Sequence, residues 1–218
     1  GQGTRLQPLT HGTPKPLIEI AGKPIIDRIF ESLPDEIMEA VVIVDHLKDN
    51  IKSHLGENFH NKKITYVEQS DKKGTFGALL SAKNNIEKNE RFLVLNGDDI
   101  HNKDELTQYL KYPRSFGVQK MHMPRYYNVN VDDNNYVQGF RPQTEEEKND
   151  KAFIATGAYV IDSNIFDHPG VVVYGGELGL PQTILEQKQD YPIKAVVTEN
   201  WIPINYLEDI EKANKLFA

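Results

Sequence analysis

The sequence contains no cysteine among its 218 residues. This absence excludes disulfide bonds, thiolate metal sites and a cysteine nucleophile. Apolar runs of membrane-spanning length and N-x-[ST] glycosylation sites are also missing, so we expect a cytoplasmic protein with no membrane partner. Basic residues number 25 against 32 acidic ones, which gives a formal net charge of −7. Because an acidic chain without a basic run binds a nucleic-acid backbone poorly, we expect no nucleic-acid partner.

The first half of the chain alternates strand and helix patterns. The β-branched run VVIVD at 41–45 predicts a strand buried on both faces, and apolar residues at helical spacing follow it. The same alternation continues with strands and helices predicted over 63–69, 75–86, 91–99 and 102–112. A βαβα succession favours an α/β fold, and we predict three layers with a Rossmann-like, mixed but mainly parallel sheet.

The pattern changes after Phe116, where shorter strands surround an Asn-Asn turn. We predict a small antiparallel excursion over 116–142, a return to a buried strand at 152–162, and an amphipathic closing helix at 205–218. No linker or repeat divides the chain. We therefore predict one domain over 1–218 with two halves, 1–115 and 116–218.

Polar residues follow several of the predicted strands directly. They are Gln69 with Gly74 and Thr75, then Asp98 and Asp99, and finally Asn205. In open α/β sheets the ligand lies beyond the carboxyl ends of the strands, so these groups converge on one edge. Each alone is equally well explained as a turn or a cap, but together they indicate a site for a metal-bound phosphorylated ligand.

The opening stretch GQGTRLQPLTHGTPKPLIEIAGKPII resembles the signature of sugar-1-phosphate nucleotidylyltransferases, G-x-G-T-R-L-x-P-L-T followed by P-K-P-L and G-K-P. The resemblance covers nearly the whole chain, through EQSDKKGTFGAL, LVLNGDDI, ATGAYVID and WIPINYLEDIEKAN. In that family a short apolar strand precedes the signature, so we expect the first strand to be missing from this sequence.

The resemblance implies that a sugar 1-phosphate attacks the α-phosphorus of a nucleoside triphosphate and releases pyrophosphate. The attacking phosphate is already ionised, so the reaction needs Mg²⁺, alignment and charge neutralisation rather than a general base. Consistently, the chain has neither a G-x-S-x-G nor an H-E-x-x-H motif. Arg5 would bind the β- and γ-phosphates, and Lys15 would neutralise charge near the α-phosphate and the sugar phosphate.

The remaining site residues follow from the same resemblance. Asp98 would hold Mg²⁺ through a carboxylate oxygen, and Gln69 would read the base. The other residues expected to bind the nucleotide are Gly1, Gly3, Thr4, Gly74 and Thr75. Those expected to bind the sugar phosphate are Arg141, Thr156 and Gly157.

Two segments depart from the family pattern. The closing segment usually reads W-x-D-[IV]-[GN]-T-P, and its aspartate is the second Mg²⁺ ligand, but Pro203 stands there. We expect Asn205, two residues on, to take that role with less charge. The sugar-site strand usually offers E-K-P, whereas this chain has Phe140 and Arg141, so the usual sugar-binding carboxylate is absent.

Two alternative functions stay open on these grounds. One is a cytidylyltransferase for phosphocholine or another alcohol phosphate, with Tyr126, Tyr127, Phe140 and Tyr174 as candidates for an aromatic cage. The other is a non-catalytic nucleotide-sensing homologue, which the loss of the aspartate at Pro203 motivates. The sequence leaves the nucleotide, the sugar and a homo-oligomeric assembly undetermined.

Overall fold

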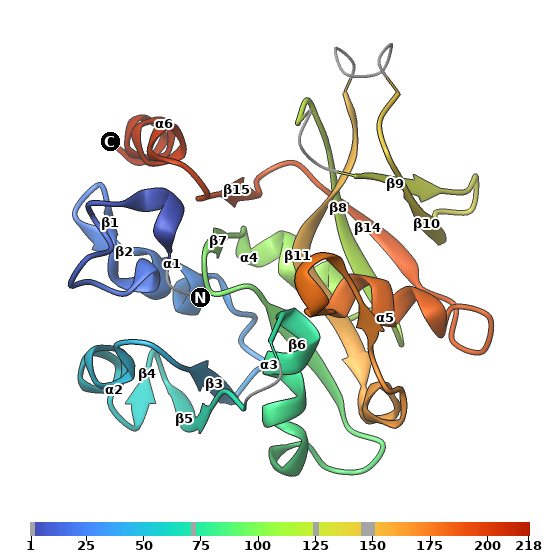
Figure 1. Ribbon diagram of the computed structural model, residues 1–218, viewed down its shortest axis with the longest axis horizontal. Coiled ribbons are helices and arrows are strands. Elements are labelled where there is room, and N and C mark those ends of the chain that lie inside the picture. The colour runs from blue at the N-terminus through green and yellow to red at the C-terminus, as the bar shows by residue number, and fades with distance from the viewer. Residues whose placement is uncertain (1–2, 71–72, 124–126, 145–150) are drawn as a thin grey trace.

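The main sheet contains four strands in the order β14-β8-β11-β6 (Figure 1). The computed structural model describes residues 3–70, 73–123, 127–144 and 151–218. Strand β14 (Lys194–Thr198) runs parallel to β8 (Ser115–Met121), and β11 (Ala152–Asp162) is antiparallel to both β8 and β6 (Arg91–Leu95). Three of the four strands therefore point the same way. The predicted α/β class with a mixed sheet is confirmed. The expectation that this sheet is mainly parallel was wrong: only the β14–β8 pairing is parallel, because β11 lies between β8 and β6 and runs opposite to both.

Helices cover both faces of this sheet. On one face α4 (Lys103–Tyr109) packs Leu106 and Tyr109 against the even-numbered residues Ala158 and Val160 of β11. On the other face α3 (Thr75–Ser81) and α5 (Leu180–Glu186) pack against odd-numbered residues such as Ile161. This alternation follows from the two-residue period of a strand. It produces the predicted three layers.

A second sheet contains β3 (Glu39–Val44), β5 (Lys62–Glu68) and β4 (Asn58–Phe59). Strands β3 and β5 are parallel, and α1 (Ile25–Ser32) and α2 (Lys48–Leu55) share one apolar cluster with them. The prediction that 41–45 is buried on both faces was wrong, because of these residues only Val44 is buried. Among the described residues β3 pairs with β5 alone, so it is an edge strand. The apolar cluster covers the side chains of β3 only in part.

The antiparallel excursion is smaller than the sequence predicted. It consists of β9 (Asn128–Val131) and β10 (Val137–Arg141), joined by the expected turn. Strand β8, which we had assigned to the excursion, belongs to the main sheet. Its residues 115–118 are buried, because β8 lies between β11 and β14 and pairs with both.

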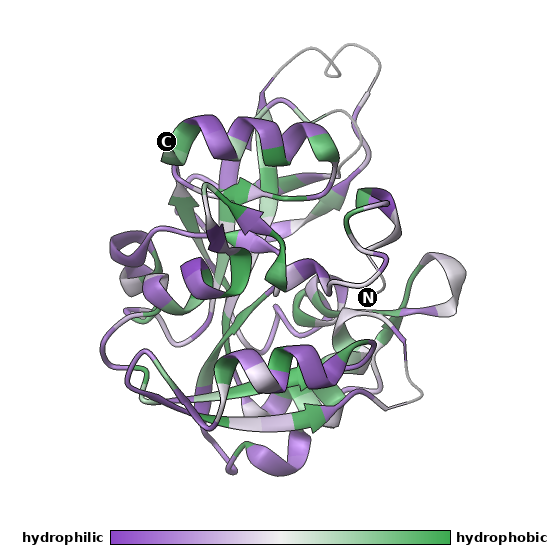
Figure 2. Cartoon of the chain, turned by 90° about the vertical axis from the view of Figure 1, so that its left-hand side faces the viewer, coloured by the Kyte–Doolittle hydropathy of each residue, from purple (hydrophilic) through white to green (hydrophobic). Residues whose placement is uncertain are grey.

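Short elements complete the chain. The 3-10 helices are η1 (Thr4–Leu6), η2 (Lys15–Leu17), η3 (Lys83–Asn85), η5 (Ser163–Asp167) and η6 (Tyr174–Gly176). The short strands are β1 (Glu19–Ile20), β2 (Lys23–Pro24), β7 (Asp99–Ile100), β12 (Val171–Val172), β13 (Leu178–Gly179) and β15 (Ile202–Pro203). The closing helix α6 (Leu207–Phe217) carries hydrophobic and hydrophilic residues in alternation (Figure 2). None of the helices in the described ranges has the length and apolar character needed to cross a membrane.

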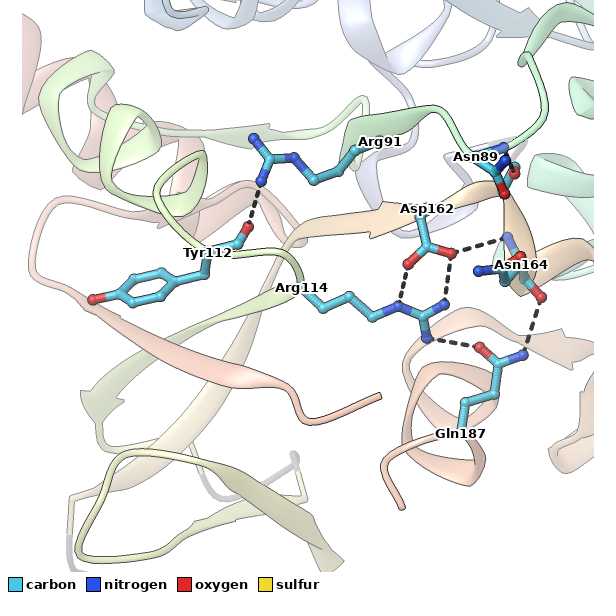
Figure 3. A network of polar contacts seen from close by, with 8 residues as sticks. Asn89, Arg91, Tyr112, Arg114, Asp162, Asn164 and Gln187 are labelled. Atoms are coloured by element: carbon cyan, nitrogen blue, oxygen red, sulfur yellow. Dashed lines mark hydrogen bonds and ion pairs between the residues drawn. The ribbon is translucent and has the colours of Figure 1, made fainter. Parts of the chain in front are cut away.

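A buried ion pair ties β8, β11 and α5 together at the end away from the predicted site (Figure 3). Arg114, only 2% exposed, donates to both carboxylate oxygens of Asp162 at 2.6 and 2.9 Å and to Gln187 at 2.8 Å. Its guanidinium also lies 3.9 Å from the centre of the Tyr191 ring. Partial burial raises the pKa of Asp162, but the hydrogen bonds and charge of Arg114 outweigh it and hold that pKa below its usual range.

Candidate functional site

The opening loop is closed by a contact between its two ends. Gly3 has φ of +61° and accepts hydrogen bonds from the amide of Leu6 and from the hydroxyl of Thr10, both at 2.9 Å. A Cβ at Gly3 would lie 2.8 Å from the methyl group of Thr10 and 3.4 Å from the Cβ of Lys15. The loop therefore needs glycine at this position, both for its left-handed backbone and for space. Thr4 and Arg5 remain exposed in η1.

Lys15 brings the opening loop to the carboxyl end of β6. Its ammonium nitrogen lies 2.5 Å from Oδ2 of Asp98, with side-chain exposures of 12% and 36%. Pro16 supports this approach, because its ring lies 4.0 Å from where a Cβ of Gly97 would stand. The structure thus places the predicted phosphate-binding lysine directly against the predicted metal ligand.

The closing segment reaches the same place through β15. Pro203 is paired with Asp99 across the antiparallel β7–β15 contact, so the residues after Pro203 run back toward Asp98. Asn205 is held by its backbone N–H, which donates to Asp209 Oδ2 at 2.8 Å. The guanidinium of Arg5 lies 5.8 Å from the centre of the next ring, Tyr206. The predicted residues Arg5, Lys15, Asp98 and Asn205 are therefore brought to one region by three distant segments.

Asp99 differs from its neighbour Asp98 because it points inward. It is 4% exposed, and its Oδ2 accepts a hydrogen bond from the Asn96 amide at 3.0 Å. Burial, and then the charge of Asp98, raise the pKa of Asp99 well above its usual range, although Asn96 and Lys15 act in the opposite direction. Asp99 is thus part of the support of the site rather than an exposed ligand.

Gly157 lies directly against this support. It has φ of +73°, and a Cβ there would stand 2.7 Å from Oδ2 of Asp99 and would collide with the Asn96 amide. It occupies an irregularity in the pairing of β11 with β8, and its carbonyl accepts from the Asn96 backbone N–H at 3.0 Å. Because no side chain fits, the predicted sugar-site glycine is explained by the close approach of the middle of β11 to the end of β6.

The other predicted sugar-phosphate residues lie differently. Thr156 is fully buried, and its hydroxyl is 3.3 Å from the phenol oxygen of Tyr109. A ligand contact from Thr156 would therefore have to come from its backbone. Arg141 is half-buried at the end of β10 and donates to Asn130 Oδ1 at 3.2 Å.

The predicted nucleotide-binding turn at the start of α3 is fixed by a neighbouring segment. Gly74 has φ of +91°, and a Cβ there would collide with the backbone of Leu178. Leu178 donates to the Lys73 carbonyl, and Leu180 donates to the hydroxyl of Thr75, both at 2.9 Å. Gln69 is half-buried beside this turn, where its backbone N–H bonds the carbonyl of Val44 at 2.9 Å. Gly1 lies outside the described residues.

The aromatic side chains considered for a quaternary-ammonium cage are dispersed. Phe140 packs against Phe116 in the core, with ring centres 5.9 Å apart. Tyr174 is 100% exposed and Tyr127 is 61% exposed, so neither faces an enclosed space. Tyr126 lies outside the described residues. The described rings give no support to a cage.

The donor set near Lys15 is compatible with Mg²⁺. This ion takes one or two protein carboxylates together with substrate phosphates and water, rather than a complete protein cage. Asp98 offers an accessible carboxylate and Asn205 an amide oxygen, while Asp99 is turned inward. Within the described ranges no group of three or more acidic or histidine side chains could hold a metal alone. Such a site would depend on ligand phosphates.

Sequence reasoning did not single out Asn96, Glu177 or Gln182. All three line a cavity of about 190 Å³ that also borders Gly74, Thr75 and Tyr159. Asn96 was hidden within a strand pattern, and GGELGLPQ at 175–182 carried no ligand motif. The only sequence signal was that Asn96 ends a predicted strand two positions before Asp98, which could have indicated that Asn96 belongs to the site.

The chain is similar in sequence to known proteins. The family model described as Nucleotidyl transferase matches residues 1–173. The bifunctional protein GlmU of Methanocaldococcus jannaschii is 33% identical over 219 residues, which cover 99% of this chain and 52% of that protein. The UTP–glucose-1-phosphate uridylyltransferase AglF of Haloferax volcanii is 31% identical over 228 residues, which cover 99% of this chain and 92% of that protein. The chain spans about half the length of the GlmU relative.

The fold is also similar to that of a solved enzyme. A UDP-glucose pyrophosphorylase complexed with UDP-glucose superimposes with a TM-score of 0.83 at 18% identity, covering all of this chain and 95% of that one. At this identity the likeness concerns the fold alone.

Proposed function

The chain belongs to the nucleotidyl transferase family, and on that premise we propose that it joins a nucleoside triphosphate to a sugar 1-phosphate. The products are a nucleotide-sugar and pyrophosphate. The observation that carries the proposal is the 2.5 Å contact between Lys15 and Asp98, which joins the glycine loop to the end of β6. A cation and an anion at this junction suit a reaction between two phosphorylated substrates.

The reaction transfers a nucleotidyl group in line. An oxygen of the sugar phosphate forms a bond to the α-phosphorus, and the bond from that phosphorus to the oxygen bridging to the β-phosphorus breaks. The electron pair leaves on pyrophosphate, and no proton transfer is required. Lys15 binds the anionic oxygens around the α-phosphorus, and Arg5, exposed in η1, binds the departing pyrophosphate. The glycine turn at Gly3 lets the backbone approach the phosphates.

Mg²⁺ would be held by Asp98 and Asn205, and when bound it would neutralise phosphate charge and align the triphosphate. Asp98 is 36% exposed and so is accessible to such a ligand. Lys15 would then exchange its contact with Asp98 for substrate phosphate. Asp99 would hold the side chain of Asn96 in place throughout, because its carboxylate accepts a hydrogen bond from the Asn96 amide.

The proposal is tested by incubating the full-length protein with Mg²⁺, each common nucleoside triphosphate, and a panel of acceptors. The acceptors are glucose 1-phosphate, N-acetylglucosamine 1-phosphate, phosphocholine and inositol 1-phosphate. We expect pyrophosphate release and a nucleotide-sugar detectable by mass spectrometry with a sugar 1-phosphate. Turnover with phosphocholine or inositol 1-phosphate alone would replace the sugar by an alcohol phosphate. Binding of a triphosphate without turnover of any pair would favour the nucleotide-sensing function.

A further inference from the structure

We propose that the cavity lined by Glu177 and Gln182 receives the hydroxyl groups of the acceptor, with Glu177 supplying the carboxylate that Phe140 does not offer. This inference rests on the proposed function and deepens it. The acceptor it predicts is a sugar 1-phosphate whose ring carries free hydroxyls remote from the phosphate.

The cavity lies beside the turn at Gly74 and the end of β6. Gly74 and Thr75 form one wall, and Asn96 and Tyr159 form another. Asn96 bonds Gly157 through its backbone and Asp99 through its side chain, and it stands two positions before Asp98. A ligand group in this space would therefore extend from the same place where Lys15 meets Asp98.

Two polar side chains in this cavity are available to a ligand. Within the described ranges, neither the carboxylate of Glu177 nor the amide of Gln182 has a hydrogen-bond or ion-pair partner, although both line the cavity. The backbone beneath Glu177 is fixed, because its carbonyl accepts from Val173 at 2.8 Å and the next residue, Leu178, bonds Lys73. A free carboxylate on a fixed backbone is a preorganised acceptor for hydroxyl groups.

The size and the lining indicate a single sugar ring. The cavity volume of about 190 Å³ lies below the range of about 300–1,000 Å³ typical of drug-sized ligands. Val173, Leu178 and Pro181 supply apolar surface beside the polar groups, which suits a ring with both C–H and O–H groups. Tyr159 is the one aromatic residue in the lining as described, so a quaternary ammonium would find no cage.

The test uses the full-length protein and separates acceptor binding from turnover. With the preferred sugar 1-phosphate, Glu177→Ala should raise the acceptor KM by about tenfold or more, while the triphosphate KM and kcat stay within about twofold. Glu177→Gln should recover part of the loss, because its amide oxygen still accepts a hydrogen bond. Glu186→Gln, at an exposed position near the end of α5, is the matched control and should leave all constants unchanged.

Deoxy acceptors identify the contact. With the deoxy sugar 1-phosphate that lacks the hydroxyl bound by Glu177, wild type and Glu177→Ala should have the same acceptor KM. The inference is overturned if Glu177→Ala leaves the acceptor KM unchanged for every sugar 1-phosphate that the wild type turns over, although the proposed function would then stand. If the wild type uses no sugar 1-phosphate, both fail. A rise in the triphosphate KM alone would assign the cavity to the nucleotide and would also overturn the inference.

Discussion

The ammonium group of Lys15 lies 2.5 Å from the carboxylate of Asp98, although 83 positions separate the two residues. One belongs to the glycine-rich opening loop and the other follows β6, an edge strand of the main sheet. In the absence of substrate each neutralises the other. Bound substrate phosphates would attract Lys15 and a bound cation would attract Asp98, so the two side chains would separate. The same two charges would then stabilise the empty site as an ion pair and the occupied site as ligands.

Replacing Asp98 with asparagine should reduce kcat at least about a hundredfold, because the neutral amide removes charge from the expected metal site. The free energy of unfolding should stay within about 1 kcal/mol of the wild type, since the ion pair is partly exposed. Steady-state kinetics at saturating Mg²⁺ and urea unfolding measure the two effects. The exposed Asp190→Asn is the control. Near-normal turnover in Asp98→Asn would remove Asp98 from the metal site.

Asn205 should determine how much Mg²⁺ the enzyme requires. A carboxylate binds this ion more strongly than an amide, so Asn205→Asp should lower the Mg²⁺ concentration for half-maximal activity. Asn205→Ala should raise it. Initial rates across a Mg²⁺ titration compare the three proteins. Identical titration curves would show that Asn205 is no ligand.

Gly74→Ala should lower the free energy of unfolding by more than about 1 kcal/mol, because φ is +91° and the new Cβ meets the backbone of Leu178. Gly139→Ala is the matched control, since a Cβ there has no neighbour within 4 Å in the part of the chain that the structure describes. Urea unfolding followed by circular dichroism measures both variants. Equal losses in the two would mean that the turn yields without strain.

His101 should make stability depend on pH. It is 6% exposed, its Nε2 has no hydrogen-bond partner among the described residues, and burial lowers its pKa from 6.5 to about 4. Between those values the unfolded state binds the additional proton, so stability is lost as the pH falls from about 6.5 to about 4, by up to about 3 kcal/mol. Urea unfolding across this window should show a weaker pH dependence in His101→Leu. The exposed His46→Leu should retain the wild-type dependence.

Asp162→Ala should cost about 2–3 kcal/mol of stability, because it leaves Arg114 buried without its bidentate partner. Arg114→Met in the same background should recover part of this loss by removing the unpaired charge. A double-mutant cycle from urea unfolding gives the coupling between the two side chains. Additive effects would show that the pair does not contribute as a unit.

The sequence by itself determined the class of fold and predicted the charged residues of the candidate site. Alternating strand and helix periods specified the elements, since burial of one face imposes a period of 2 or 3.6 on apolar residues. The N-cap at Asn102 is also a local feature, because its side chain accepts from the amides of Asp104 and Glu105 at 2.9 and 3.1 Å. The opening loop was recognisable because glycines, Arg5 and Lys15 occur at fixed spacing.

Tertiary structure decided how those residues meet. The pairing of β8 with β11 and β14 placed β8 in the main sheet, and the pairing of β3 with β5 alone left β3 half-buried. These pairings join strands that are distant in sequence, so the local pattern does not specify them. The same packing turned Asp99 inward while Asp98 stayed accessible, and it set Glu177 beside Gly74. A linear pattern carries no information on such long-range approaches, because they arise only when separate segments share one core.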